Sequence, residues 1–232
     1  SFCHTGTMKF LSNLRMAEIL GQVIQVKNEL NDWNKNKERK VTNIVFMGMG
    51  EPLYNYENVI KTLNILTDEK GLAISKRKIT LSTSGVVPKI KMFKDDSDVN
   101  LAVSLHAAYD EIRNELVPIN KKWPISTLLN ALKEYSYTRK NKRITFEYIM
   151  LKDINDSMDD AKELIKLIRP FKAKVNLIPF NPWPGSKYQV SSREKIENFK
   201  NYILDKGKLV ATIRAPRGED VLAACGQLKS LG

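Results

Sequence analysis

Cysteine and histidine are scarce in this sequence of 232 residues, which contains only two of each. Cys3 and Cys225 lie near opposite ends of the chain, and they do not look like the disulfide framework that stabilises many small secreted proteins. A reducing, cytoplasmic location fits this cysteine usage. Two cysteines together with the dispersed His4 and His106 also make a zinc site an unfavourable interpretation.

Long apolar runs and linkers are absent as well. No run approaches the roughly 18 apolar residues of a membrane-spanning helix, and no secretory leader is recognisable, so we expect a soluble protein without a membrane partner. No repeat, low-complexity tract or Gly/Ser linker divides residues 1–232, which predicts one domain. The sequence leaves the oligomeric state open, and we expect a monomer. An initiating Met is missing too, because the chain opens "SFCHTG"; we therefore expect a piece of a longer protein.

Acidic residues are outnumbered by basic ones. Asp and Glu total 26 against 38 Lys and Arg, which gives a net charge of +12 and a pI of about 9.5. Such an excess favours a polyanionic partner such as nucleic acid. A lysine-rich composition that only reflects a biased genome and a solvated surface explains the charge equally well, so charge alone leaves both interpretations open.

Short apolar segments alternate regularly with amphipathic ones. After Asn13, apolar residues recur at helical spacing from Met16 to Ile24, which predicts a first helix. Six apolar segments are typical of buried strands: residues 43–48, 78–83, 101–106, 144–150, 174–179 and 209–214. The intervening segments predict helices at 57–67, 125–137, 158–168 and 193–204, with a shorter one after residue 83. This alternation predicts an α/β fold with a parallel sheet, as in a complete or partial (β/α) barrel.

Glycine and polar residues follow the predicted strands. The segments "GMGEP" (48–52), "STSG" (82–85), "SLHA" (104–107) and "FNPWPG" (180–185) all stand at carboxyl ends of strands. Active sites of α/β barrels are built at this edge of the sheet. We therefore expect these four segments to meet around one ligand site.

Each of these candidates also has an ordinary structural explanation. Gly50 and Glu51 suit close approach of a ligand and a charge-assisted hydrogen bond, but Gly and Pro are also common in turns. Ser82 offers hydrogen bonds to a ligand, or its segment caps the next helix. His106 can bind, orient or protonate a ligand, or lie buried with its hydrogen bonds satisfied. Asn181 is either held rigidly against a ligand or is a turn residue.

Cys225 lies in "AACGQL", shortly after Arg214 and Arg217. Neighbouring arginines lower the pKa of a thiol and favour the reactive thiolate. A lone cysteine among alanines is more often inert packing, and Cys3 has a similar alternative. The "C-x-T-G" context of Cys3, however, is typical of a loop that leads into a helix.

Several blocks, taken in order, are more specific than any single residue. They are "FCHTG", "AEILGQV", "NIVFMGMGEPLYNYENV", "RKITLSTSGVVP", "VSLHA", "RNELVPINKKWPI", "NLIPFNPWPG" and "RGEDVLAACGQL". Together they resemble the radical S-adenosylmethionine (SAM) adenine C2 methyltransferases of 23S rRNA and tRNA, the RlmN/Cfr-like family. The resemblance covers essentially the whole chain and implies a partial TIM-like barrel of the radical SAM type.

The resemblance implies two cofactors, a [4Fe–4S] cluster and SAM. The family holds three irons of the cluster through a C-x-x-x-C-x-x-C loop, of which Cys3 matches the last cysteine. The first two cysteines, the first strand and an N-terminal accessory domain would then precede this catalytic core. His4 occupies a variable position, and we interpret it as a tolerated variant that is not a ligand.

The remaining roles are also carried over by resemblance. Gly50 and Glu51 would bind the SAM amino group, and a further set would hold the rest of SAM: Ser82, Ser104, Leu105, His106 and Asn181. Cys225 would be the cysteine that accepts a methyl group from one SAM and then loses a hydrogen atom to the radical formed from a second. An electron donor would reduce the cluster, and 23S rRNA and tRNA would be the substrates.

Three interpretations remain after this comparison. The first is an RNA adenine C2 methyltransferase, in which Arg214 and Arg217 would hold RNA phosphate near Cys225. The second is another radical SAM enzyme that uses the same barrel on a different substrate. The third is an RNA-binding remnant that keeps the basic barrel but has lost cluster chemistry. The sequence upstream of Ser1 would distinguish a trimmed domain from a remnant.

Overall fold

The computed structural model describes residues 2–34, 37–139, 142–215 and 226–228. Its centre is a six-stranded parallel sheet in which the strand order follows the chain order. The strands are β1 (Ile44–Phe46), β2 (Ile79–Thr83), β3 (Asn100–Ser104), β4 (Ile144–Met150), β5 (Ala173–Pro179) and β6 (Val210–Ile213). The predicted α/β fold with a parallel sheet is therefore confirmed, and the six predicted strands are all present.

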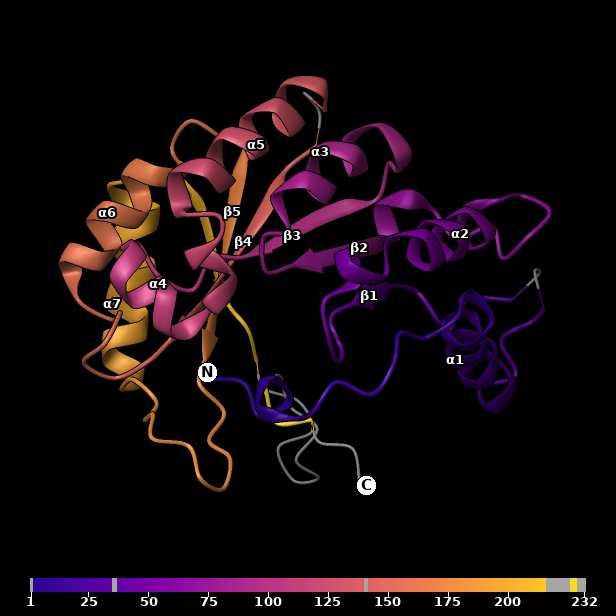
Figure 1. The fold of residues 1–232 in the computed structure, drawn as a ribbon, viewed down its shortest axis with the longest axis horizontal. Helices are drawn as coiled ribbons and strands as arrows, with labels where there is room; N and C mark the ends of the chain where they lie inside the picture. Colours follow the sequence, from indigo (N-terminus) through magenta and orange to yellow (C-terminus); the bar gives the residue numbers. More distant parts are fainter. Residues whose placement is uncertain (1, 35–36, 140–141, 216–225, 229–232) are drawn as a thin grey trace.

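Helices connect the strands and form an arc around one side of the sheet (Figure 1). They are α1 (Met16–Glu29), α2 (Tyr56–Thr67), α3 (Val87–Asp96), α4 (Asp110–Leu116), α5 (Ile125–Thr138), α6 (Met158–Ile168) and α7 (Arg193–Asp205). Short 3-10 turns lie at Thr5–Thr7, Pro52–Asn55, Lys76–Lys78 and Pro118–Lys121. A sheet whose strands keep chain order and whose helices cover one face is the architecture of a partial barrel.

Two features differ from the sequence-based prediction. Strand β3 ends at Ser104 and not at His106, because His106 adopts a positive φ of 60° that an extended strand cannot contain. Helix α4 was not predicted at all. It has only seven residues, and the charged Arg113 at its centre is fully buried, so its apolar pattern is too short to be recognised in the sequence.

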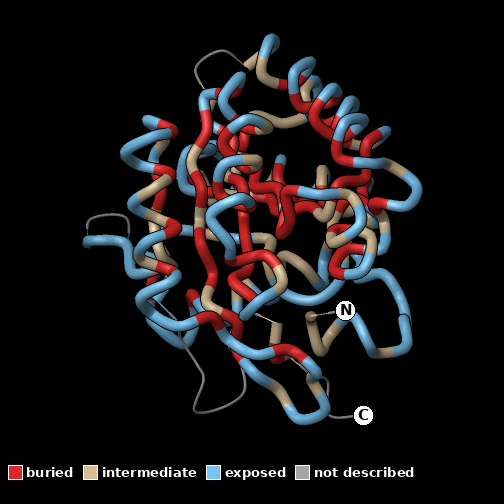
Figure 2. The backbone as a smooth tube through the Cα atoms, turned by 90° about the vertical axis from the view of Figure 1, so that its left-hand side faces the viewer, coloured by how far each residue is buried: buried red, intermediate tan, exposed pale blue. Residues whose placement is uncertain are grey.

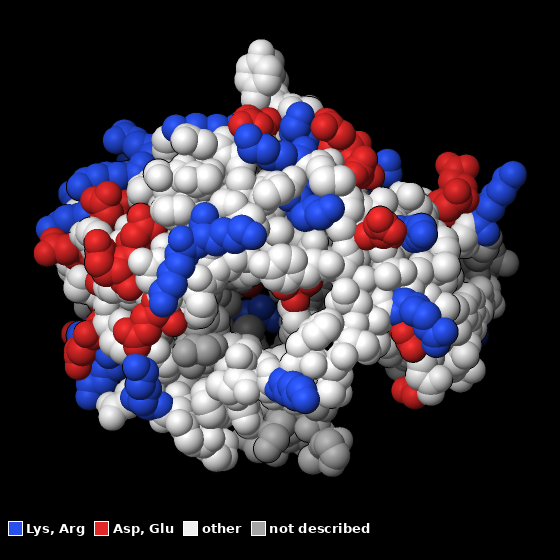
Figure 3. All heavy atoms as spheres, in the orientation of Figure 1, with Lys and Arg blue, Asp and Glu red and all other residues white. Residues whose placement is uncertain are grey.

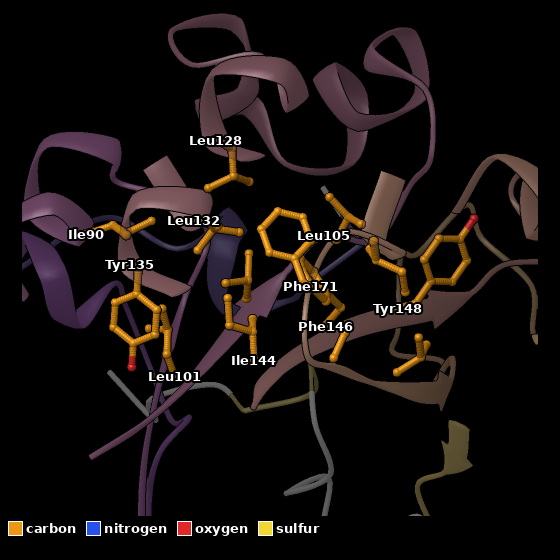
Figure 4. Close-up of a cluster of buried hydrophobic side chains, with 14 of the residues drawn as sticks. Ile90, Leu101, Leu105, Leu128, Leu132, Tyr135, Ile144, Phe146, Tyr148 and Phe171 are labelled. Carbon is orange, nitrogen blue, oxygen red and sulfur yellow. The ribbon is translucent and has the colours of Figure 1, made fainter. Parts of the chain in front are cut away.

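The hydrophobic core fills the space between the sheet and the helices. In Figure 2, the buried stretches of the backbone lie mainly in the interior of the molecule. Figure 4 shows Leu101, Leu105, Phe146 and Tyr148 among the buried side chains. Successive strand residues point to opposite faces, so the residues between these on β3 and β4 face the other way. That inner face carries Glu147 and the other polar residues described below.

Among the described residues, no helix is both long enough and apolar enough to cross a membrane.

Candidate active site

A cavity of about 870 Å³ lies at the carboxyl ends of the strands. Figure 3 shows a hollow near the middle of the view, with acidic and basic side chains facing into it. The volume is in the range of small-molecule sites, roughly 300–1,000 Å³. Most residues proposed from the sequence line this cavity: Cys3, Gly50, Glu51, Ser82, Ser104, His106 and Asn181.

Four further candidates have different positions. Arg214 lines the cavity, although the sequence suggested only a contact with RNA phosphate for it. Cys225 and Arg217 lie outside the described residues, but Gly226, the chain neighbour of Cys225, lines the cavity. Leu105 does not line the cavity, because its side chain packs in the hydrophobic core while those of Ser104 and His106 point to the opposite face.

The Glu51 carboxylate is fixed at the end of β1. One oxygen, Oε1, accepts a hydrogen bond from the Leu53 amide at 3.0 Å, which caps the short turn Pro52–Asn55. The other, Oε2, accepts from both the amide and the hydroxyl of Ser84, at 2.7 and 2.6 Å. Gly50 supplies the positive φ of 80° that leads the chain into this turn. The result is a carboxylate held in place at the cavity wall, suited to a cationic group.

The segment after β2 belongs to the cavity and does not cap the next helix. Ser84 binds Glu51, and the Thr83 hydroxyl accepts the Gly85 amide at 3.1 Å. Helix α3 begins after Val86 without any side-chain hydrogen bond to its first turn. The capping alternative is therefore wrong for this segment.

His106 is buried, and its ring completes the β3–β4 pairing. Its Nδ1 accepts the Ile149 amide at 3.1 Å, in the place where a strand carbonyl would continue the ladder. Since Nδ1 accepts, the neutral ring carries its proton on Nε2. Burial, assisted by the positive charge of Arg113, lowers the His106 pKa to about 3. His106 therefore serves the cavity as a neutral hydrogen-bond donor and is not a proton source at ordinary pH.

Arg113 joins the ends of β2 and β3 from behind the cavity. Its guanidinium donates to three backbone carbonyls, those of Ser84 at 2.8 Å, Ser104 at 3.0 Å and Leu105 at 2.9 Å. It also donates to the Asn120 side chain at 2.7 Å. Burial lowers the Arg113 pKa to about 10, so the group remains charged at neutral pH. Sequence reasoning missed this residue, and its only signal was its place in the "RNELVPIN" block.

Asn155 holds the backbone of His106 in its unusual conformation. Its amide nitrogen donates to the carbonyls of His106 and Ile149, both at 2.7 Å, and its Oδ1 accepts the Leu151 amide at 2.8 Å. The side chain is fully buried and uses these donors and acceptors within the protein. Asn155 was also missed, because a buried amide after a strand looks like an ordinary turn residue in sequence.

Glu147 is a buried carboxyl group on the inner face of β4. Its Oε1 accepts a long hydrogen bond from Asn176 at 3.4 Å and lies 3.8 Å from Nη1 of Arg214. No described residue donates a hydrogen bond to its Oε2, and Glu147 lines the cavity. Burial raises the Glu147 pKa, while Arg214 opposes that rise. A single carboxylate within the apolar strand "ITFEYIM" was the sequence signal for this group.

The metal-binding capacity of the described residues is small. They contain no group of three or more His, Cys, Asp or Glu side chains that could hold a metal ion. Cys3 is half-buried and lines the cavity, as does Glu51. The described residues thus offer one sulfur ligand at the cavity, and a metal site there would need its other ligands from outside them.

Known proteins match this chain over nearly its whole length. A curated protein of Bradyrhizobium diazoefficiens, "Dual-specificity RNA methyltransferase RlmN", is 55% identical over 232 residues, which cover 99% of this chain and 58% of that protein. A protein of the same name from Rhodopseudomonas palustris is 54% identical with the same coverage. The chain thus spans less than two thirds of the length of these relatives.

Solved structures share the fold. A radical SAM methyltransferase from Sphaerobacter thermophilus has a TM-score of 0.91 and 42% identity, covering 98% of this chain and 65% of that one. A domain of pyruvate-formate lyase-activating enzyme from Bacteroides vulgatus, at 16% identity and a TM-score of 0.57, covers 75% of this chain and 99% of that domain. This second likeness concerns the fold alone.

The family model described as the Radical SAM superfamily matches residues 1–168. That range includes Cys3 and the loops after β1, β2 and β3, each of which contributes residues to the cavity wall. Because the match covers most of the chain and agrees with both the strand order and the place of the cavity, this chain belongs to the radical SAM superfamily.

Proposed function

We propose that this chain is the catalytic core of a radical SAM RNA methyltransferase that methylates carbon 2 of adenine in 23S rRNA and tRNA. The observation that carries the proposal is the convergence of Cys3, Glu51, His106 and Asn181 on one cavity, although they come from four separate segments. The names of the 54–55% identical relatives support the RNA substrate. The net charge of +12 suits the same substrate.

We assign the binding of SAM to the cavity wall. The Glu51 carboxylate would accept the SAM ammonium group, because Ser84 and the Leu53 amide already fix its position. The Nε2 proton of His106 and the Asn181 amide would hold the rest of the molecule, together with Ser82 and Ser104. The Leu105 side chain lies in the core, so we propose that it acts only by packing.

The described residues fit a cluster only in part. A [4Fe–4S] cluster, when bound, supplies the electron that cleaves SAM. Cys3 would provide one of its thiolate ligands, and we propose that two further cysteines precede Ser1 in a longer protein, beside an accessory domain. An electron donor is then a required partner.

Cys225 would carry the methyl group. A cysteine thiolate attacks the methyl carbon of SAM, so that a sulfur–carbon bond forms on the protein while the bond from that carbon to the SAM sulfonium breaks. Adenine C2 is not nucleophilic and cannot take a methyl group in this way, which is why a carrier that can react through a radical is needed. Gly226, the next residue, lines the cavity and supports this assignment.

The test compares this chain with one extended upstream through the expected cysteines. Both are reconstituted anaerobically with iron and sulfide, and iron content and visible absorption are measured. We expect about four irons only in the extended chain, followed by 2-methyladenosine in rRNA and tRNA fragments analysed by mass spectrometry. Iron uptake and SAM cleavage without RNA methylation would indicate another radical SAM enzyme. Absence of iron from both chains, with RNA binding intact, would indicate the RNA-binding remnant.

A further inference from the structure

Three segments that are distant in sequence meet at one side of the cavity. They are the N-terminal segment (residues 2–7), the 181–186 loop and the C-terminal segment (residues 226–228). Figure 1 shows the N-terminal end beside the yellow C-terminal residues. The His4 amide donates to the Gly226 carbonyl at 2.8 Å, and the Thr5 hydroxyl donates to the Leu228 carbonyl at 2.6 Å.

Trp183 of the 181–186 loop contacts both chain neighbours of Cys3. Its indole Nε1 donates a hydrogen bond to the Phe2 carbonyl at 2.8 Å. Its ring also stacks flat on the His4 imidazole, with the ring centroids 4.5 Å apart and the planes inclined by 3°. One rigid side chain therefore fixes the backbone before Cys3 and the side chain after it.

Additional contacts hold the same three segments together. The Phe2 ring packs edge-on against the His106 ring, with centroids 4.7 Å apart. The buried Gln227 amide donates to the Pro182 carbonyl at 2.7 Å, directly before Trp183. The 181–186 loop also carries the buried Asn181. Trp183 thus contacts both chain neighbours of Cys3 and stands two residues after Asn181, which is assigned to SAM.

We propose that Trp183 is a positioning residue for Cys3, and that its stacking on His4 and its hydrogen bond to Phe2 together hold the Cys3 thiol at the cavity. His4 then has a specific role, because its imidazole is the stacking partner of the indole ring. The sequence alone predicts only a tolerated variant at this position. The proposal rests on the proposed function, because it concerns the ligand that Cys3 would give to the cluster.

The first measurement needs no cluster. In the full-length protein without iron, the alkylation rate of Cys3 by iodoacetamide is followed by mass spectrometry of its peptide. Trp183→Ala removes both contacts and should raise the rate on the order of tenfold, the combined effect of one aromatic pair and one hydrogen bond. Trp183→Phe keeps a ring to stack on His4 and should give a smaller rise, and so should His4→Ala, which keeps the hydrogen bond.

Trp33 provides the matched control. It is half-exposed, its indole also donates one hydrogen bond, to Asn28 at 2.7 Å, and it also contacts a neighbouring side chain, Lys27. Trp33→Ala should leave the Cys3 alkylation rate unchanged. A wild-type rate in Trp183→Ala, or equal rises in Trp183→Ala and Trp33→Ala, would overturn the proposal, and circular dichroism confirms that each variant is folded.

The second measurement uses the reconstituted full-length protein. The visible absorption of the cluster is followed after an iron chelator is added, and the electron paramagnetic resonance spectrum of the reduced cluster is recorded. Trp183→Ala should lose iron faster than the wild type by a factor similar to that for alkylation, and Trp183→Phe should lie between them. If the wild type itself binds no iron, the proposed function fails, whatever the alkylation rates show. If the wild type binds iron and Trp183→Ala retains it equally well, only this inference fails.

Discussion

At the scale of single residues, three buried polar side chains determine how the ends of β2, β3 and β4 lie at the cavity. Arg113 holds the carbonyls of β2 and β3, His106 accepts an amide of β4, and Asn155 holds the His106 backbone. Each of these side chains is buried, and its partners are buried or partly buried. Replacing one leaves several buried groups without a partner, so the cost is larger than that of one hydrogen bond.

Arg113→Met tests this at the most connected residue. Four acceptors lose their donor: the carbonyls of Ser84, Ser104 and Leu105 and the Asn120 side chain. An unsatisfied buried group costs about 1–3 kcal/mol, so we expect the free energy of unfolding to fall by at least about 3 kcal/mol. Urea denaturation measures the change.

Arg39→Met is the control for that experiment. The exposed Arg39 also donates to a backbone carbonyl, that of Ala73 at 3.0 Å. Its replacement should change the free energy of unfolding by less than about 0.5 kcal/mol. Equal losses in the two variants would show that burial of the Arg113 network is not what stabilises these strand ends.

His106 makes stability dependent on pH. Its pKa is about 3 in the folded protein against an ordinary value of 6.5, so the unfolded chain binds more protons between these values. Its neutral form therefore favours folding above pH 6.5, and this contribution is lost as the pH falls from 6.5 toward 3. We expect the loss to approach about 1.4 kcal/mol per pH unit within that window.

The variant that separates this contribution is His106→Asn. Asparagine tolerates a positive φ and offers an oxygen close to the position of Nδ1, so it can keep the Ile149 hydrogen bond. Between pH 7 and pH 5, its free energy of unfolding should fall less steeply than that of the wild type. A wild-type pH dependence in His106→Asn would contradict the assignment.

At the scale of elements, the loops after the strands form the site, and the helices hold those loops. The β4–α6 loop contains one residue of each kind. Asn155 binds the His106 carbonyl at the cavity, whereas Ser157 caps helix α6 by accepting the Asp160 amide at 3.1 Å. The two residues are neighbours in sequence but serve the site and the helix separately. Their substitutions should therefore have separable effects.

Asn155→Ala should both destabilise the protein and weaken the binding of S-adenosylhomocysteine to the full-length protein, measured by titration calorimetry. Loss of its amide leaves the His106 and Ile149 carbonyls unpaired and releases the His106 backbone. Ser157→Ala removes only a helix cap, which costs about 1 kcal/mol of stability, and should leave binding unchanged. Parallel losses of binding in both variants would argue against a specific link between Asn155 and the site.

The place of the site could be predicted at this scale because it depends on the order of elements. Gly50, Ser82, His106 and Asn181 follow apolar segments, and the carboxyl ends of parallel strands meet at one edge. Leu105 shows that position after a strand is not sufficient to place a side chain at the site. Successive residues point to opposite faces, so Leu105 lies in the core while its neighbours Ser104 and His106 line the cavity.

The supporting network could not be predicted in the same way. Arg113 and Asn155 look in sequence like surface residues, because their burial depends on partners that are distant along the chain. The same holds for the stacking of Trp183 on His4. Residue patterns report local periodicity, whereas these contacts depend on how the loops pack after the sheet has formed.

At the scale of the whole molecule, the positive charge is distributed. Figure 3 shows basic side chains interspersed with acidic ones on the face in view, and several surface lysines pair with neighbouring carboxylates. If the chain binds RNA as proposed, the number of phosphates that it contacts should therefore be well below the net charge of +12.

Arg214→Gln tests one such contact by the salt dependence of RNA binding. If Arg214 neutralises a phosphate, the slope of log affinity against log salt should decrease by about 0.7–0.9 in magnitude. Fluorescence anisotropy with a labelled RNA fragment measures the slope. If the slope is unchanged but S-adenosylhomocysteine binds more weakly, Arg214 acts within the cavity as the ion-pair partner of Glu147. The Glu147 Oε1 lies 3.8 Å from the Arg214 guanidinium.

The contact between the two ends of the described chain has a consequence for biosynthesis. Thr5 donates to a carbonyl 223 positions later, and His4 binds Gly226. During translation the residues around Cys3 therefore leave the ribosome well before their docking partners, which are made 223 positions later in the case of Thr5 and Leu228. The wall of the cavity beside Cys3 therefore closes only after synthesis has passed Leu228, so a cluster bound as proposed above would gain the support of these contacts only after that point.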